Sequence, residues 1–471
     1  MILHAARVVL ILLEVIVLFN LLIVVHELGH FLAARWRGLV IEQFGIWFGK
    51  PLWKKRINGV LYTFGSLPFG GFVKLPQLAP MDIIEGKADV DRESLPQISA
   101  LDKIIVAVAG PLFSLLLAVA FAAIVWVVGH PVNESDVTTT IGYIEKTSPA
   151  FKAGLRAGDK ILEVDGQRVT RFSGMNDSVI WNVVRSEGPT IPFKVQRGNE
   201  TLAVDVVPYK AETRGWRRKS VRQVQIYPAQ TAVIEKVQPN TPAAAAGLKQ
   251  GDVIRGFNGT QIFHPIALAD YIEAHPDEML TLDVSRARQS LQVQVQPKIL
   301  PGEKTARIGI QWDSGGIMSV GHPNPLEQVY HSVTSTLNTL GAVASPKSDV
   351  KLQHMSGPLG IARVYYMLFE SEYGWQLALW FSVILSVNLA ILNMLPIPVL
   401  DGGHITLALV ESVRRKPVNI RVLEIVQTAC AILIIGYMVY ITFYDVQDLP
   451  WVKGKLDKLE HRDPNKAGAD E

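Results

Sequence analysis

The sequence predicts a multi-pass α-helical membrane protein that carries a polar insertion of two domains. Three observations predict it: four apolar segments long enough to cross a bilayer, a polar segment at about 130–320 between the second and third of them, and a repeat within that segment. The composition agrees, because 49% of the 471 residues are hydrophobic and only 19% are charged. A net charge of +3 without a dense basic patch argues against a nucleic-acid partner. The single cysteine, Cys430, excludes disulfides within the chain and a cysteine-built zinc site.

Each apolar segment reaches the length of about 20 residues that a helix needs to cross roughly 30 Å of hydrocarbon. The apolar runs lie at about 8–34, 104–128, 377–395 and 425–443. We place them in predicted spans at 1–36, 101–129, 374–396 and 423–445. The first run could instead be a secretory signal peptide, but it lacks a clearly basic start and continues past the usual length.

Lysine and arginine predict the orientation, because they concentrate in short cytoplasmic loops. One cluster follows the first span and consists of Arg35, Arg37, Lys50, Lys54, Lys55 and Arg56. A second cluster lies between the third and fourth spans and consists of Arg414, Arg415, Lys416 and Arg421. Both clusters lie on the cytoplasmic side only if the N-terminus is outside and successive spans cross the membrane in alternating directions. We therefore expect cytoplasmic loops at 37–100 and 397–422, an outer segment between spans two and three, and a tail at 446–471.

The outer segment contains a repeat of turn-forming residues. It alternates apolar and polar residues as half-buried strands do, for instance at 223–226 and 291–295. The same separation along the sequence relates four pairs of identical residues: Gly154 and Gly247, Gly158 and Gly251, Asp159 and Asp252, Gly166 and Gly259. A constant offset indicates duplicated domains, predicted at 130–218 and 219–302, with a linker and amphipathic region at 303–373.

Each repeat reads as a short helix ending in Ala-Gly-Leu, a Gly-Asp turn, a strand and a hairpin turn. This pattern resembles PDZ domains of the bacterial protease type, which are α+β folds. PDZ domains bind extended peptides by adding a strand to a sheet edge. The alternative, two small β-domains that act only as spacers, stays open, because ligand binding does not follow from a fold.

The strongest chemical signal is the HELGH sequence at residues 26–30, late in the first apolar segment. His26 and His30 are four residues apart, so they lie on one face of a helix and can bind one zinc ion, while Glu27 can act on a water molecule there. Ionisable residues inside an apolar span cost energy and normally face a polar partner. The alternative, solvated residues at a helix end, does not explain this spacing.

A catalytic zinc usually has three protein ligands, so the third must come from elsewhere. The candidate is Asp401, in the sequence NMLPIPVLDGGH at residues 393–404. The prolines end the third span, and the paired glycines permit a tight turn. Asp401 could alternatively cap a helix that starts near Ile405.

HELGH in the first span and N-x-L-P-x-P-x-L-D-G-G-H after the third together resemble the site-2 protease family of intramembrane zinc metalloproteases. The resemblance covers nearly the whole chain and includes four spans with two tandem PDZ domains outside the cytoplasm. It implies one Zn2+ per chain, held by His26, His30 and Asp401, with Glu27 as the catalytic acid/base.

Further residues match features of that family. Residues 62–74 resemble its membrane-dipping β-hairpin, expected at about 58–76, and this implies a substrate-binding role for Gly70, Gly71 and Phe72. Asn388 and Asn393 match third-span asparagines linked to substrate handling. Gly-rich backbone at membrane depth is tolerated only against protein or a water-filled cavity.

Some positions remain without a role. Ser356-Gly357-Pro358 matches a family motif ahead of the third span. Ser114 departs from the pattern, because the family often has asparagine there after Gly110-Pro111. Glu14 and His404 stay unassigned.

The resemblance also implies a substrate class and a location. It implies an endopeptidase of the bacterial inner membrane that cleaves single-pass membrane proteins. These include an anti-sigma factor already trimmed by another protease, in an envelope stress response, and remnant signal peptides. The N-terminus and PDZ domains would be periplasmic and the active site would face the cytoplasm. Membrane lipid and peptide ligands of the PDZ domains are the other expected partners.

Two other classes of function stay open. In a membrane scaffold the metal would be structural, but such a site needs no acid/base like Glu27 between its ligands. A zinc transporter would spread polar ligands over several spans, whereas the second and fourth spans offer almost none.

Overall fold

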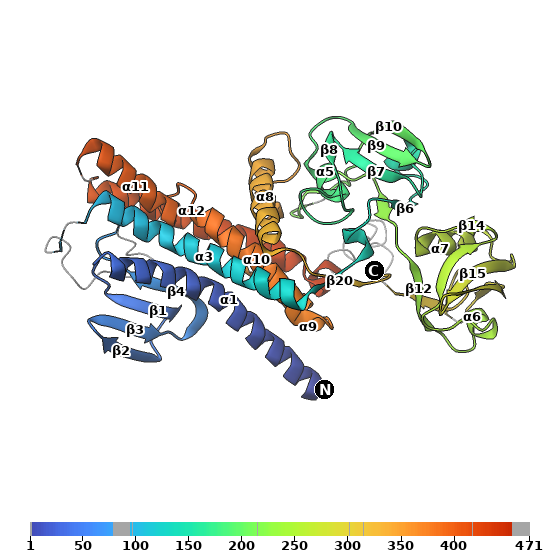
Figure 1. Ribbon diagram of the computed structural model, residues 1–471, viewed down its shortest axis with the longest axis horizontal. Helices are drawn as coiled ribbons and strands as arrows, with labels where there is room; N and C mark the ends of the chain where they lie inside the picture. The colour runs from blue at the N-terminus through green and yellow to red at the C-terminus, as the bar shows by residue number, and fades with distance from the viewer. Residues whose placement is uncertain are drawn as a thin grey trace, which may run out of the picture. The chain divides into compact units, whose positions relative to one another are not determined.

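The computed structural model describes residues 2–78, 95–96, 98–213, 215–300, 302–313, 315–416 and 418–454. It forms two compact units (Figure 1). The helical unit comprises Met1–His130, His322–Leu337 and Leu352–Glu471, and the β-rich unit comprises Pro131–Gly321 and Asn338–Lys351. The parts of the predicted loop at 79–94 and of the predicted tail beyond 454 lie outside the described residues.

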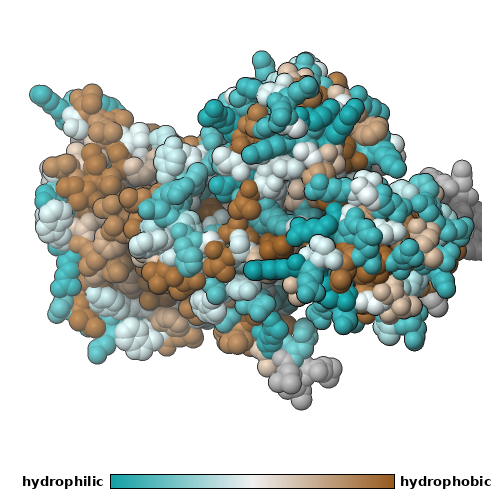
Figure 2. Space-filling view, turned by 45° about the vertical axis from the view of Figure 1, so that its right-hand side comes forward, coloured by the Kyte–Doolittle hydropathy of each residue, from teal (hydrophilic) through white to brown (hydrophobic). Residues whose placement is uncertain are grey.

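Among the described residues, four helices are long and apolar enough to cross a membrane, and each overlaps one of the four predicted spans. They are α1 (Ile2–Trp36), α3 (Ala100–Val128), α10 (Gly374–Asn393) and α12 (Ile420–Gln447). Large apolar side chains such as Val9, Leu13 and Val17 stay exposed along α1, as lipid-facing residues do. Figure 2 shows hydrophobic residues spread over the surface of the helices.

The helices α1, α3 and α10 share one apolar core, which includes Leu18, Leu22, Ala118, Ala122 and Val383. Within this core α3 lies against both α1 and α10. Two further helices, α8 (Pro325–Ala344) and α9 (Pro358–Glu370), precede α10, and α11 (Asp401–Arg414) follows it.

The fourth span is mostly exposed, and a buried aspartate near its end contacts α9. Only 11% of the apolar window of α12 is buried. Near its end, Asp445 Oδ2 accepts hydrogen bonds from the N–H groups of Gly357 and Gly360, both at 3.0 Å. A carboxylate at a helix N-terminus satisfies unpaired N–H groups and the helix dipole. The Ser356-Gly357-Pro358 motif is therefore the start of α9, capped by α12.

A four-stranded sheet packs beside α1. Its strands are β1 (Gln43–Phe48), β2 (Trp53–Ile57), β3 (Val60–Phe64) and β4 (Leu67–Lys74), in the order β2-β3-β1-β4. Phe31 of α1 contacts Phe44 and Tyr62 of the sheet, with ring centroids 5.2 and 6.1 Å apart. β4 forms one edge.

The predicted hairpin at 62–74 is wrong in its pairing. β3 and β4 do not pair with each other, because β1 lies between them, parallel to β3 and antiparallel to β4. The chain crosses the end of β1 at Gly65, where a Cβ would meet Phe48 O at 2.3 Å. Glycine makes this crossing possible, since no side chain fits between the two backbones.

The β-rich unit contains two apolar cores, one for each half of the repeat. The first half has the strands β6 (Ile141–Ile144), β7 (Lys160–Val164), β8 (Gln167–Arg168), β9 (Ile191–Arg197), β10 (Glu200–Val206) and β11 (Ile226–Pro228), and the helices α4 (Pro149–Lys152) and α5 (Val179–Arg185). The second half has β12 (Ala232–Val237), β13 (Val253–Phe257), β14 (Thr260–Gln261), β15 (Leu280–Arg286), β16 (Gln289–Val295), β17 (Lys298–Ile299), β18 (Ala306–Arg307) and β19 (Ile310–Trp312), with α6 (Pro242–Ala245) and α7 (Pro265–Ala274). Short strands β5 (His130–Val132) and β20 (Ser319–Gly321) flank the two domains in sequence.

The domain boundaries lie later than predicted. β11 pairs with β6, and Val224 is in the first core, so residues 224–228 close the first domain rather than open the second. β19 pairs with β12, and Ile308 is in the second core, so residues 306–312 belong to the second domain rather than to the linker. In both domains the last strand returns to the first, which is a long-range pairing that local sequence patterns do not predict.

The same buried ion pair supports both domains. Asp159 and Asp252 each accept two hydrogen bonds of 2.7 Å from an arginine, Arg197 and Arg286 respectively. Each carboxylate also accepts a backbone N–H at the Gly-Asp turn, at 2.9 and 2.8 Å. Burial by itself raises the pKa of Asp252, but the hydrogen bonds from Arg286 and Lys249 outweigh it, so this pKa lies below its usual value.

We predict that Asp252→Asn destabilises the second domain by about 2–3 kcal/mol, because Arg286 loses a charged hydrogen-bond partner. The low folded pKa of Asp252 means that the pair stabilises the domain above pH ~4 and that this stability is lost as the pH falls through the folded pKa. Amide hydrogen exchange of residues 232–312 in the full-length protein measures both effects. Asp277→Asn, at an exposed position of the same domain, is the control; equal exchange in the two variants would contradict the prediction.

Candidate metal centre

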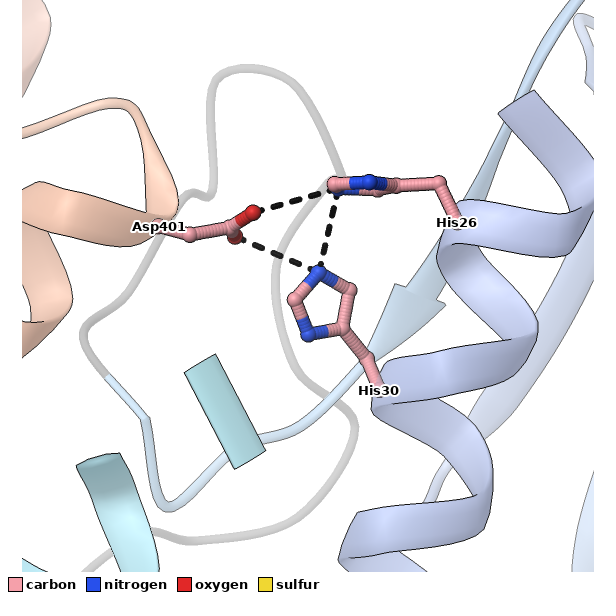
Figure 3. Close-up of side chains that lie close together, drawn as sticks. All are labelled: His26, His30 and Asp401. Carbon is pink, nitrogen blue, oxygen red and sulfur yellow. Dashed lines mark hydrogen bonds and ion pairs between the residues drawn. The ribbon is translucent and has the colours of Figure 1, made fainter. Parts of the chain in front are cut away.

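The three predicted ligands lie together in the helical unit. His26 and His30 occupy successive turns of α1, and Asp401 is the first residue of α11 (Figure 3). Asp401 Oδ2 lies 3.1 Å from His26 Nε2, and Oδ1 lies 3.2 Å from His30 Nε2. The two Nε2 atoms are 3.3 Å apart. Both histidines are buried.

This donor set fits a zinc ion. A tetrahedral zinc with ligands at about 2.0–2.1 Å separates its ligand atoms by roughly 3.3 Å. The three separations of 3.1, 3.2 and 3.3 Å match that edge length. Among the described residues this is the one cluster of at least three histidine, cysteine or acidic side chains close enough to hold a metal ion. Two imidazoles and one carboxylate leave a fourth position for water or substrate.

A tight turn brings Asp401 to the histidines. The N-cap of α11 is Leu400, so Asp401 does not cap the helix, which starts at 401 and not near 405. A Cβ on Gly402 would meet Met394 O at 2.3 Å, and one on Gly403 would meet Ile397 O at 2.2 Å. The paired glycines therefore let the turn after α10 pack directly on the first turn of α11. An ion pair of 2.7 Å between Lys103 and Glu411 joins α11 to α3.

Glu27 lies between the metal cluster and β4. A Cβ on Gly71 would lie 3.6 Å from Glu27 Cγ and 3.9 Å from Ile23 Cγ2, so the strand backbone passes close to α1 at this glycine. The predicted acid/base is thus beside both the histidines and the edge strand.

The other predicted site residues divide into two groups. Asn393 is at the centre, because its Nδ2 lies 3.3 Å from His26 Nε2. Asn388 is bonded elsewhere, since its carbonyl oxygen accepts the hydroxyl of Thr336 on α8. Phe72 stacks on Phe48 with ring centroids 5.5 Å apart, so its ring packs against the sheet.

Two groups on α3 that have no assigned role also contact the histidines. Ser114 Oγ lies 2.9 Å from His26 Nδ1, and Val106 O lies 2.8 Å from His30 Nδ1. The signal that could have identified them is the four-residue spacing of Val106, Gly110 and Ser114, which places them on one face of α3.

Comparison with known proteins identifies relatives over nearly the whole chain. The sequence pattern of peptidase family M50 matches residues 14–437 of this chain. Protease RseP of Yersinia pestis is 27% identical over 92% of this chain and 98% of its own length. The regulator of sigma-E protease RseP of Escherichia coli K12 is 28% identical over the same shares. A protein of Neisseria meningitidis named as a zinc metalloprotease is 29% identical over 87% of this chain and 93% of its own.

One solved structure resembles a small part of the chain. The PDZ domain of an SdrC-like protein from Listeria innocua is 19% identical and covers 17% of this chain and 92% of its own, with a TM-score of 0.17. That score is too low to support an argument about the fold.

We predict that Asp401→Asn weakens zinc binding at least tenfold, because a neutral amide replaces a charged ligand. Mutation of residues that only hydrogen-bond to metal ligands already lowers metal affinity by about 10–100-fold. Zinc content and affinity of the purified protein in detergent measure this effect. Asp205→Asn makes the same change at an exposed position of the β-rich unit and should leave zinc bound. Unchanged affinity in Asp401→Asn would mean that another residue is the third ligand.

Proposed function

Because the chain belongs to peptidase family M50 and is a zinc metalloprotease with four membrane-spanning helices, we propose that it cleaves single-pass membrane proteins within or at the edge of the bilayer. The observation that carries this proposal is the position of the metal cluster. Two of its residues lie inside the first apolar span, and the third follows the third span directly. A hydrolytic centre built between membrane helices acts on substrates that reach it through the bilayer.

In this proposal His26, His30 and Asp401 hold the zinc ion. Zinc, when bound, supplies a Lewis acid that polarises the scissile carbonyl and makes a water molecule more acidic. Glu27 accepts the proton of the attacking water and passes it to the leaving amine, as general acid/base catalysis requires. Asn393, next to His26, is placed to donate a hydrogen bond to the substrate carbonyl.

The substrate segment adds as a strand to β4. A transmembrane helix must unwind before cleavage, and its exposed backbone groups then need partners. β4 is an edge strand of the sheet and passes Glu27 at Gly71. Gly70, Gly71 and Phe72 thus contribute backbone groups to bind an extended peptide. Asn388 contacts the substrate only after it leaves Thr336.

Basic residues support a cytoplasmic position for this centre. The exposed strand β2 carries Lys54, Lys55 and Arg56, and Arg414 and Arg415 end α11. Positive loops stay in the cytoplasm. In this proposal the β-rich unit and the N-terminus lie on the periplasmic side of a bacterial inner membrane.

The substrates in this proposal are proteins that another protease has already trimmed on the periplasmic side. The name of one relative, regulator of sigma-E protease, supports an anti-sigma factor and a role in an envelope stress response. Remnant signal peptides are a second class, since they are also short single spans.

The two β-domains act as PDZ-type domains that control access. In the second domain a groove runs between α7 and residues 305–312, lined by Leu268, Ile272, Ile308, Ile310 and Trp312 among others. A groove beside a strand fits an extended peptide. The pair either excludes substrates with bulky outer domains or captures peptide ends.

We predict that Glu27→Gln keeps its zinc but lowers the cleavage rate at least a hundredfold, because general acid/base catalysis contributes about 10²–10⁴-fold. The assay uses the purified protein in detergent with a model single-span substrate, with and without a zinc chelator. The chelator should abolish wild-type cleavage. Glu14→Gln, at the other glutamate of α1, should remain active. Cleavage by a zinc-loaded Glu27→Gln variant at the wild-type rate would exclude Glu27 as the acid/base.

We predict that deleting residues 131–321 allows cleavage of substrates that still carry a folded outer domain, because the deletion removes the size barrier. Cleavage of trimmed and untrimmed substrates is compared in the same membrane preparation. If the deletion only slows cleavage of trimmed substrates, the domains capture peptides instead of excluding bulky ones.

A further inference from the structure

One face of α3 is built around the two histidines. Val106, Gly110 and Ser114 are spaced by four residues, so they line up along the helix, and all three are buried. Each of them meets a histidine ring of α1. α3 supplies none of the three predicted metal ligands.

The contact of His30 defines where its proton lies. His30 Nδ1 is 2.8 Å from the backbone oxygen of Val106. A carbonyl oxygen only accepts hydrogen bonds, so Nδ1 carries the hydrogen and donates it. The lone pair of the neutral ring is then on Nε2, which faces Asp401 and His26.

His26 has the same arrangement with a different partner. His26 Nε2 lies 3.1 Å from Asp401 Oδ2 and 3.3 Å from His30 Nε2, so this nitrogen faces the other two proposed ligands. His26 Nδ1 lies 2.9 Å from Ser114 Oγ, and a hydroxyl can accept the Nδ1 hydrogen when Nε2 binds the ion. Both rings thus direct Nε2 to the same point and turn Nδ1 to α3.

Gly110 provides the space for the His30 ring. A Cβ at this position would lie 2.2 Å from His30 Nε2 and 2.5 Å from Cε1. On the facing helix, a Cβ on Gly29 would lie 2.4 Å from Ala109 O. The two glycines let α1 and α3 approach closely enough for the Nδ1 contacts to form.

We propose that Ser114 is a positioning residue for the metal centre: together with the Val106 carbonyl it fixes both histidines in the tautomer that offers Nε2 to the ion. The inference rests on the proposed assignment of His26 and His30 as zinc ligands. A ligand histidine that donates its other ring N–H to a fixed acceptor is oriented and made more basic, and removal of such an acceptor costs about 10–100-fold in metal affinity. Ser114 is 1% exposed, so water does not readily replace its hydroxyl.

The test measures zinc affinity of the full-length protein in detergent by competition with a chromophoric chelator. Ser114→Ala should bind zinc about 10–100-fold more weakly than the wild type. Ser114→Thr keeps a hydroxyl acceptor and should restore most of the affinity. The absorption spectrum of the cobalt-substituted protein should change in Ser114→Ala, because His26 is free to rotate.

Ser386→Ala is the matched control. Ser386 is also 1% exposed and lies on a membrane helix, α10, and its hydroxyl has no hydrogen-bond partner within the described parts of the chain. This variant should bind zinc as the wild type does.

Three results would overturn the inference. Wild-type zinc affinity and an unchanged cobalt spectrum in Ser114→Ala would show that the hydroxyl does not position His26. Equal losses in Ser114→Ala and Ser386→Ala would show a general loosening of the helices instead. A wild-type protein that binds no zinc, or keeps its zinc when both histidines are replaced, would overturn the proposed ligand assignment itself and is thus distinct from the first two results.

Discussion

The helical unit depends on holding an aspartate within 3.1–3.2 Å of two histidines among apolar helices. Buried polar and charged groups are costly unless each has a partner at close range. The small residues of the unit follow from this requirement. Gly29 and Gly110 let α1 and α3 come into backbone contact, and Gly402 and Gly403 let the turn before α11 lie on the helix. A side chain at any of these positions would move the helices apart and break the close contacts of the two histidines and Asp401.

α1 also contacts both the metal cluster and the edge strand of the proposed active centre. One part of its surface carries His26 and His30, which contact α3 and Asp401. Another part, at Ile23 and Glu27, lies against the backbone of β4 at Gly71. Because one rigid helix carries all three catalytic-motif side chains, the position of the edge strand relative to the metal cluster is fixed by packing against that helix and not by a flexible loop.

The sequence was sufficient where a feature depends on local pattern. The four spans were predicted from the length of the apolar segments. The two histidines of HELGH were predicted to share a site because residues four apart lie on one face of a helix. The sequence was insufficient where a feature depends on contacts between residues that are far apart along the chain. Nothing local indicates that β1 lies between β3 and β4, or that residues 224–228 return to β6. Ser114 showed the same limit, because its contact with His26 depends on how two helices pack, which the four-residue spacing along α3 does not specify by itself.

The contacts between α1 and α3 bear on how the chain enters the membrane during synthesis. His26 and Ser114 are 88 residues apart, and His30 and Val106 are 76 apart, whereas Asn393 lies 367 residues after His26. The ribosome therefore delivers the histidines long before the segment that contains Asp401. Since domains fold in order as they are made, the second helix gives both imidazoles a hydrogen-bond partner while the β-rich unit is still being translated. The first two helices can thus wait in the bilayer as a stable pair, and the metal centre is completed only when the last third of the chain arrives.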